Sequence, residues 1–592
     1  MTADTSVAAS ERQAVLGISV LGLETHRLSF PVVYCGLKQV CVPIGSWSVR
    51  LDQSTADALL ADNLAFLIPS RYDQMVFEGQ TARFSTATQV FTDLPLSNNI
   101  PPIASDPTSF SDYQQRLQTY LNTHITPQMQ QILATAAEAR YLEMNAQERG
   151  TFLREQARAT GMPAVVLEGL ISSSYAFGFY LPRMQGGITI RQVERTRYDG
   201  SKYIVYSTSI NAPARTRMLV YQYNGKEFQP LLNLNTNTSL GLDALAQSAS
   251  SSASVETLFL PSSRNAQNIF DQAFATSFRD SAIALSTQLK EYRAFAVVTP
   301  VLGSRASAIE LAVGNQENIR VDQPFTFNRI INSRERQVGW GQVYQTGNSC
   351  LALPPEQRSL SYARLIKGRV DEADLAVEHP WTGVFATLGL TDSQLGLELQ
   401  GQETGAGGAQ FLELGFSGNL GYLRNNPSLS GWWLNMGLGF GAADDPTEST
   451  FSHLQAEGAV RFYLGMEKHW ALSHGFYSAL GGGFSVESYT FEDRTMDEQL
   501  SVSSFNLIPS AELGYHFTPN SRIFLKAAYN QPLTTRAEYK DTGEIDGDLL
   551  GGAALTLGFA MHLGFAGPYA WLIKKPSQQC NQLRDTISHQ SF

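Results

Sequence analysis

The chain has 592 residues and a formal net charge of −11 at pH 7. It is too long for a single hydrophobic core, so several domains are expected. The acidic balance, with no basic stripe, argues against nucleic acid as a partner. Charged residues make up only 16% of the chain, while 48 Gly and 23 Tyr favour β-structure. No run of about 18 apolar residues occurs, which excludes a transmembrane helix.

The first residues, "MTADTSVAASERQ", lack the basic and apolar regions of a signal peptide. Two interpretations stay open at this point. Either the chain is soluble inside the cell, or a signal peptide has been removed or lies outside this sequence.

The N-terminal part is expected to consist of mixed α/β small domains. Residues 1–110 are strand-rich and are expected to form a first domain. Residues 111–244 combine a helical segment over 112–160 with strands over 176–232, where "YDGSKY" has the composition of a hairpin turn. Residues 245–257, "LAQSASSSASVET", have the composition of a Ser/Ala linker.

Residues 258–375 are expected to hold a helix and a small β-barrel. Apolar residues at helical spacing predict the helix: Phe270, Phe274, Phe278, Ile283, Leu285 and Leu289. Gly314, Gly339 and Gly341 then punctuate short strands over 294–349. The pattern predicts a five-stranded barrel of the SH3-like or OB type.

From residue 381 to residue 565, apolar residues alternate with small or polar ones. In "LLGGAALTLGFAMHLGF" (549–565), Leu555, Leu557 and Phe559 alternate with Thr556 and Gly558. A period of two, kept over about ten residues and broken by turn residues, indicates β-strands. About eight strands are predicted, at 383–400, 410–423, 431–442, 452–465, 473–490, 500–517, 522–532 and 550–565.

The composition of the two faces favours a membrane β-barrel over a soluble β-sandwich. The apolar face is rich in Leu, Phe, Met, Trp and Tyr, as in a lipid-facing band with aromatic girdles. The other face is dominated by Gly, Ala, Ser and Asn with isolated charges, which suits the crowded lumen of a narrow barrel. Buried charges must be paired, and we expect a lumen charge cluster of Glu413, Glu457, Arg461, Glu512 and Lys526.

The first predicted strand changes parity. Its first half has apolar residues at even positions, from Val384 to Leu390. Its second half has them at odd positions, namely Leu395, Leu397 and Leu399. A bulge near Thr391–Gln394, or a separate extra strand, would explain the switch.

Residues 381–565 resemble a small outer-membrane β-barrel of diderm bacteria, with a closing strand like the signal read by the barrel-insertion machinery (Thr556, Gly558, Met561, Leu563). The resemblance implies an antiparallel transmembrane barrel with both ends on the periplasmic side. The N-terminal region would then be periplasmic. Residues 566–592 continue past the closing strand, so this tail is expected to stay in the periplasm or fold back.

Catalytic and metal-binding patterns are weak. His469 and His474 lie close in sequence without a third ligand at zinc-site spacing. Asp444 and Asp445, with His453, offer carboxylates that could activate water, although "DDP" is more often a turn. No nucleophile-elbow, Walker or dinucleotide motif occurs. We expect no enzyme activity, no cofactor and no metal.

Three functions remain open. The first is a non-enzymatic outer-membrane anchor for a periplasmic interaction module, which would be a structural or assembly component of an envelope complex. The second is a porin-like channel, and the third is a barrel hydrolase or acyltransferase. The first is preferred, because eight strands leave no aqueous path. The expected partners are outer-membrane lipid and other envelope proteins, with oligomerisation possible and no nucleic acid.

The four cysteines permit two disulfides in a periplasmic chain. Cys35 and Cys41 bracket a turn between two short apolar strands, so they are expected to pair across a hairpin. Cys350 precedes the barrel and Cys580 follows it, and a bridge between them would clamp the tail to the N-terminal region. The alternatives are a buried unpaired role for the first pair and free thiols for the second.

Overall fold

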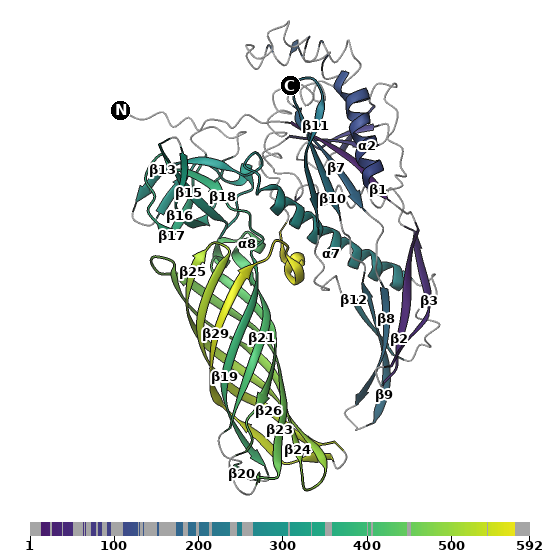
Figure 1. Cartoon of the computed structure of the whole chain (residues 1–592), viewed down its shortest axis with the longest axis vertical. Coiled ribbons are helices and arrows are strands. Elements are labelled where there is room, and N and C mark those ends of the chain that lie inside the picture. The colour runs from purple at the N-terminus through teal and green to yellow at the C-terminus, as the bar shows by residue number, and fades with distance from the viewer. Residues whose placement is uncertain are drawn as a thin grey trace.

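The computed structural model of the chain is mainly β (Figure 1). It describes most of residues 14–574. The longer stretches outside the description are 1–13, 51–72 and 128–172 apart from isolated residues, 96–109, 237–245, 252–263, 350–357 and 575–592. Among the described residues, no helix is long and apolar enough to cross a membrane.

The N-terminal region is built on two sheets. The seven-stranded sheet has the order β11-β10-β7-β1-β4-β5-β6, with β1 Ala14–Leu23, β4 Asp73–Glu78, β5 Thr81–Ser85, β6 Phe91–Pro95, β7 Ser173–Leu181, β10 Arg217–Tyr223 and β11 Phe228–Asn235. The five-stranded sheet has the order β12-β9-β8-β2-β3, with β2 Arg27–Cys35, β3 Cys41–Arg50, β8 Gly187–Thr196, β9 Lys202–Asn211 and β12 Ala246–Ser251.

These sheets do not follow the boundaries expected from the sequence. Strand β1 pairs in parallel with β4 and with β7, and β2 pairs in parallel with β8, so regions 1–110 and 111–244 share both sheets. Residues 246–251, within the expected linker, form β12 and pair with β9. Main-chain hydrogen bonds to a neighbouring strand do not depend on the side chain, which allows a Ser/Ala segment to extend a sheet edge.

Two helical stretches flank the sheets. Helix α2 (Phe110–Tyr120) continues directly into the π-helical turn η1 (Leu121–Ile125). Helix α7 (Arg264–Leu289) contacts β9, β11 and β12. Its residues Phe274, Phe278, Leu285 and Leu289 are buried, as the helical spacing predicted. They join a core cluster that also includes residues at one end of the C-terminal barrel.

A small closed barrel follows α7. It has six strands in the order β13-β14-β17-β16-β15-β18, namely β13 Val298–Arg305, β14 Ala308–Leu311, β15 Pro324–Ile331, β16 Arg334–Gln345, β17 Ser361–Gly368 and β18 Leu375–Glu378. The prediction of five strands ending at residue 349 was therefore too short. Strands β17 and β18 complete the barrel, and β18 closes it by pairing with both β13 and β15.

The C-terminal domain is a closed antiparallel barrel of eight strands, as predicted. The strands are β19 Val384–Leu399, β21 Gly407–Asn419, β22 Trp432–Ala443, β23 Leu454–Ala471, β24 Phe476–Asp493, β25 Glu498–Thr518, β26 Ser521–Tyr539 and β29 Gly552–His562. Strand β29 closes the barrel by pairing with β19 and β26. We call the end where β19 begins and β29 ends the base, and the opposite end the far end.

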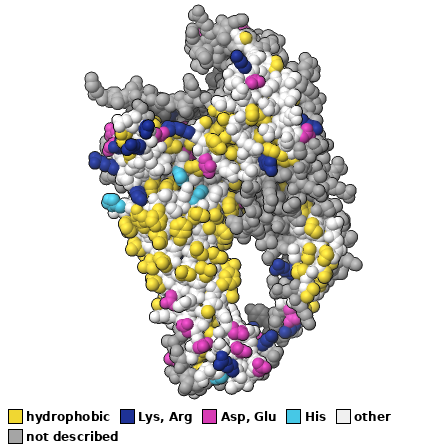
Figure 2. Space-filling model, in the orientation of Figure 1, with side chains coloured by type: hydrophobic (Ala, Val, Ile, Leu, Met, Phe, Trp, Pro, Cys, Tyr) yellow, Lys and Arg dark blue, Asp and Glu magenta, His cyan; other side chains and the backbone are white. Residues whose placement is uncertain are grey.

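An apolar band covers the half of the barrel nearest the base on the face shown in Figure 2, and exposed apolar side chains occur on all eight strands. Its outward side chains include Leu388, Leu390, Leu557 and Phe559, which are 47%, 63%, 54% and 41% exposed. Towards the far end the outward side chains become polar and charged (Figure 2). The strands are therefore longer than the apolar band.

The parity switch in β19 has a different cause from the one expected. Its register with β21 is unbroken from Val384 to Leu395, so the strand has no bulge there. Leu397 and Leu399 face inward and are buried. With residues such as Phe411, Phe491 and Val502 they fill the far end of the lumen with an apolar core.

Candidate functional site: the barrel lumen and the junction pocket

Arg461 organises the first charge group in the lumen. Its guanidinium lies 3.0 Å from Glu413 Oε1 and 3.1 Å from Glu487 Oε1, and Nη2 donates to Asn530 Oδ1 at 3.2 Å. Glu487 also accepts a hydrogen bond from the Tyr489 hydroxyl at 2.5 Å. Arg461 and Glu487 face each other in the β23–β24 register, so strand pairing brings the charges together.

A second group lies closer to the base. Lys526 forms an ion pair with Glu467, and Glu512 accepts a hydrogen bond from the Tyr477 hydroxyl at 2.6 Å. Glu512 and Lys526 are direct partners in the β25–β26 register. His469 adds an imidazole beside Glu467, with its Nε2 3.6 Å from Glu467 Oε2.

Four of the five predicted lumen residues thus lie in the lumen: Glu413, Arg461, Glu512 and Lys526. The prediction for Glu457 is wrong. It is the extra residue of a bulge between Ala456 and Gly458 near the far end, where it is exposed and accepts a hydrogen bond from Gln499. Sequence analysis missed Glu467 and Glu487. Glu467 has the same parity as Arg461, which was the available signal.

Glu467, His469 and Glu512 offer three ligand atoms that lie within 4.8 Å of one another. These residue types can bind a divalent cation. However, the ammonium group of Lys526 already neutralises Glu467. The geometry therefore fits a paired-charge cluster of the lumen.

Aromatic side chains close the lumen at the base, and the tail packs against the outer wall there. Arg522 stacks over Trp433, with its guanidinium carbon 4.3 Å from the ring centroid, and the Trp381 and Trp433 rings meet at 6.3 Å. The tail folds back as helix η7 (Gly567–Leu572). Buried Tyr569 lies on the outer side of the barrel wall, against Gly418, and places its hydroxyl 3.0 Å and 2.9 Å from the carbonyl oxygens of Phe416 and Leu434. The lumen is filled at the base by Arg522 and the two tryptophans, in the middle by the ion pairs and at the far end by the apolar core.

A polar contact surface joins the small barrel to the base. Buried Arg320 donates to the carbonyl oxygens of Lys574 at 2.6 Å and Tyr422 at 3.3 Å. On the side facing α7, Lys290 Nζ lies 2.5 Å from Glu378 Oε1. Desolvation opposes the charge of Lys290, but the field of Glu378 is strong enough to leave its pKa raised.

Asp322 also ties the small barrel to the base. Its carboxylate accepts hydrogen bonds from Ser430 Oγ and from the Gly431 amide, both at 2.6 Å. Asp322 is buried, and desolvation raises the pKa of its carboxyl although these hydrogen bonds act in the opposite direction. Lys468 donates to the Ser430 carbonyl beside it.

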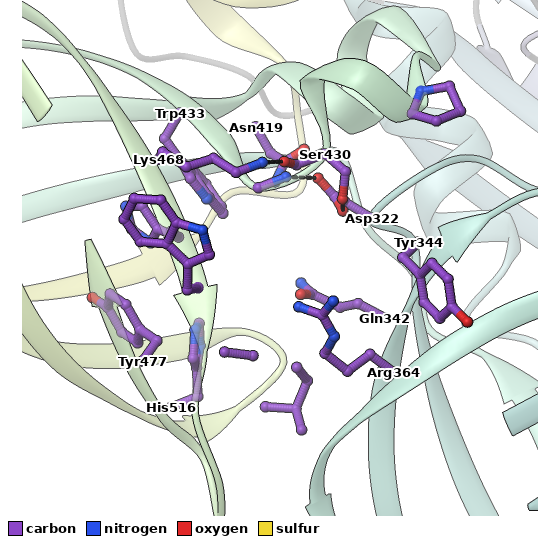
Figure 3. Close-up of a pocket in the computed structure, with 16 residues that line it drawn as sticks. Asp322, Gln342, Tyr344, Arg364, Asn419, Ser430, Trp433, Lys468, Tyr477 and His516 are labelled. Atoms are coloured by element: carbon purple, nitrogen blue, oxygen red, sulfur yellow. Dashed lines mark hydrogen bonds between the residues drawn. The ribbon is translucent and has the colours of Figure 1, made fainter. Parts of the chain in front are cut away.

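A pocket of about 370 Å³ lies at this junction, between the small barrel and the base. Arg364 and Gln342 reach into it from the small barrel, opposite Trp433, Tyr477 and His516 of the C-terminal barrel (Figure 3). Arg364 and Lys468 supply two cations, while Asp322 already accepts two hydrogen bonds from its surroundings. The lining is chemically suited to an anionic group with an aromatic or apolar body.

The carboxylates considered for catalysis support turns at the far end. Asp444 Oδ2 accepts a hydrogen bond from the Gly408 amide at 2.9 Å, and Asp445 Oδ1 accepts one from the Ala456 amide at 2.7 Å. His453 Nε2 lies 3.7 Å from Asp493. The two aspartates therefore have turn-forming roles.

The predicted Cys35–Cys41 disulfide is present and links β2 to β3. Cys350 and Cys580 lie outside the described residues, so their pairing stays a prediction.

No protein-family model matches the chain, and no curated protein matches it. Solved structures are similar to part of it. Neisserial surface protein A is 10% identical, with 31% of this chain and 98% of that chain covered and a TM-score of 0.22. Ail of Yersinia pestis is 12% identical over 31% of this chain and 100% of that chain, with a TM-score of 0.20. OprG of Pseudomonas aeruginosa is 13% identical, with 31% of this chain and 97% of that chain covered and a TM-score of 0.22.

The barrel is classified by its own geometry. Eight antiparallel strands close on themselves, and the apolar side chains of one half face outward while charged side chains pair inside. A closed barrel satisfies every strand edge, which the hydrocarbon layer requires. The C-terminal domain is thus a small β-barrel of the outer-membrane type, joined to a large N-terminal region.

Proposed function

We propose that this protein is a non-enzymatic component of a cell-envelope complex, with its barrel anchoring a periplasmic interaction module in the outer membrane. The filled lumen carries the proposal. A barrel packed by Arg461, Glu487 and an apolar far end offers no aqueous path of its own, so its role is to hold what is attached to it.

The attachment supports the same function. Both chain connections of the barrel leave at the base, and the small barrel and α7 are fixed there by Arg320, Asp322 and Tyr569. In small outer-membrane barrels with an even strand number this end faces the periplasm. The porin-like alternative would need an open lumen, and the hydrolase alternative would need a catalytic group at the far end.

Thiol accessibility tests the filled lumen. In a background with Cys350 and Cys580 replaced by Ser, we compare Ser485→Cys, which is 1% exposed in the lumen, with Met496→Cys, which is 54% exposed in a far-end turn. A charged thiol reagent should label Met496→Cys in folded protein and Ser485→Cys only after unfolding. Labelling of folded Ser485→Cys at a similar rate would favour the channel.

Orientation is tested in the same background with intact cells. Tyr292→Cys, at an exposed position between α7 and the small barrel, should be protected from a protein-coupled maleimide, too large for outer-membrane pores, that labels Met496→Cys. The opposite pattern would place the N-terminal region outside the cell.

A further inference from the structure

The five-stranded sheet of the N-terminal region forms a limb beside the C-terminal barrel. It extends from the N-terminal end of α7 along the side of the barrel, at the height of the apolar band (Figures 1 and 2). Lys202, at the start of β9 near the limb's tip, interacts electrostatically with Glu538 near the far end of β26. If the band lies in a bilayer, the limb occupies the same layer.

Four of the five strands of the limb have the length of a membrane-spanning strand. Strand β2 has 9 residues, β3, β8 and β9 have 10 each, and the edge strand β12 is described over 6 residues. A transmembrane β-strand needs about 9–11 residues. Several apolar side chains of the limb are exposed. Val40, Val42 and Ile44, at or beside β3, are 66%, 46% and 47% exposed, and Ile204 of β9 is 41% exposed.

The limb cannot cross a bilayer by itself. Among the strands that the structure describes, β3 and β12 each have one neighbour, so the sheet has two open edges. Open edges are not tolerated in the hydrocarbon layer, where unpaired N–H and C=O groups have no water to bind. A sheet at this depth must therefore be closed by strands of the same geometry.

We propose that neighbouring copies of this chain close the limb. The β3 side of one limb pairs with the β12 side of the next, and repetition of this head-to-tail contact gives a ring. The ring is a shared transmembrane β-barrel with the eight-stranded barrels around it. Counting only the four strands of spanning length in each copy, about five copies exceed the 16–18 strands that enclose an aqueous channel in porins. The assembly is therefore a pore, although each eight-stranded barrel is closed.

This inference goes beyond the anchor function and can fail separately from it. The Ser485→Cys experiment concerns the lumen of one chain, whereas the ring concerns the limb. A monomeric protein with a filled lumen would agree with the anchor function and refute the ring.

The limb's crossing is tested with two lysines at opposite ends of the N-terminal region. Lys202 lies at the tip of the limb, and Lys226 lies in the exposed turn between β10 and β11. In the background lacking Cys350 and Cys580, a maleimide coupled to a carrier protein, which is too large to pass the pore, is added to intact cells and should label Lys202→Cys and spare Lys226→Cys. Protection of both, with labelling of both after cell lysis, would overturn the crossing.

The edge pairing is tested by the oligomeric state of full-length protein in mild detergent. Wild type should be a multimer, and its insertion into planar bilayers should give steady conductance. Lysine on an edge strand opposes pairing with another chain, so Ile44→Lys should give monomers and at least a tenfold loss of conductance. Ile330→Lys, at a 65% exposed position in the small barrel, is the matched control and should change neither.

Heat-modifiable gel mobility shows whether the eight-stranded barrel is still folded in each variant. A monomeric wild type would refute the ring. So would an Ile44→Lys variant that stays multimeric and conducts like wild type.

Discussion

Asp322 is a single buried carboxylate that joins two domains. It accepts hydrogen bonds from Ser430 and Gly431 across the junction, and burial raises its pKa. Asp322→Ala should leave these two donors unsatisfied and cost about 1–3 kcal/mol, whereas Asp322→Asn keeps an acceptor and removes the buried charge. Thermal unfolding in detergent at pH 7, followed by tryptophan fluorescence, should give a higher melting temperature for Asp322→Asn than for Asp322→Ala.

The pH dependence follows from the same carboxyl. Its pKa is raised in the folded state, so the folded protein binds the proton more tightly than the unfolded chain. The destabilisation by the charged form is present at neutral pH and is relieved as the pH falls through the folded pKa towards the unfolded value. The melting temperature of wild type relative to Asp322→Asn should rise over that window. If the difference in melting temperature between wild type and Asp322→Asn is the same at pH 7 and pH 4, the prediction is wrong.

Arg461 has the corresponding role in the lumen. Arg461→Met should leave Glu413 and Glu487 buried without their cation, which costs about 3–5 kcal/mol. The double variant Arg461→Met with Glu487→Gln should recover part of that loss, because one uncompensated charge is removed. Urea unfolding in lipid vesicles measures the stability of both variants. Equal stabilities of the single and the double variant would show that Arg461 and Glu487 are not energetically coupled.

At the scale of the strand, β29 tests which residues meet lipid. Leu557→Arg or Phe559→Arg places a charge in the apolar band and should cost about 2–4 kcal/mol. Gln394→Arg is the control, since Gln394 is an exposed residue of β19 beyond the band, where the expected cost is about 0–1 kcal/mol. Folding into vesicles measures the difference. Equal costs at the two positions would argue against a lipid-facing band.

Strand patterning explains how much of the fold could be predicted. The eight-stranded barrel follows from the period of two, because lipid and lumen impose it on every strand. Leu397 and Leu399 could not be placed from sequence, since an inward apolar core at the far end has the same alternation as a lipid-facing segment. Only the unbroken register of β19 shows which side they face.

The site was predicted less completely for a related reason. Arg461 and Glu413 were found because isolated charges stand out in a strand of small residues. Glu487 was missed because the neighbouring glycines 481–483 obscure the alternation of β24. Strand β12 and the junction residue Asp322 depend on partners distant in sequence, and nothing local in the chain identifies those partners.

At the scale of the whole molecule, the tail fixes the N-terminal region to the barrel. The Ala566 and Gly567 amides donate to Asp280 of α7 at 2.9 Å and 3.0 Å, while Tyr569 is fully buried against the outer wall of the barrel, at Gly418. Tyr569→Ala should cost about 3–5 kcal/mol of docking and expose the junction to limited proteolysis. Trp571→Ala, at a 63% exposed position, is the matched control and should leave the cleavage rate unchanged.

The remaining cysteine pair would strengthen this attachment. Arg320 of the small barrel donates to the carbonyl of Lys574, so the chain enters the tail beside the small barrel, and Cys350 belongs to the connection between strands β16 and β17 of that barrel. A Cys350–Cys580 bridge would close a loop of more than two hundred residues, for which chain entropy gives on the order of 5 kcal/mol as an upper figure. Non-reducing peptide mapping should yield one cross-linked peptide containing both cysteines. Free alkylation of both thiols in protein from the oxidising envelope would show that the polar and aromatic contacts of the base hold the tail without a covalent clamp.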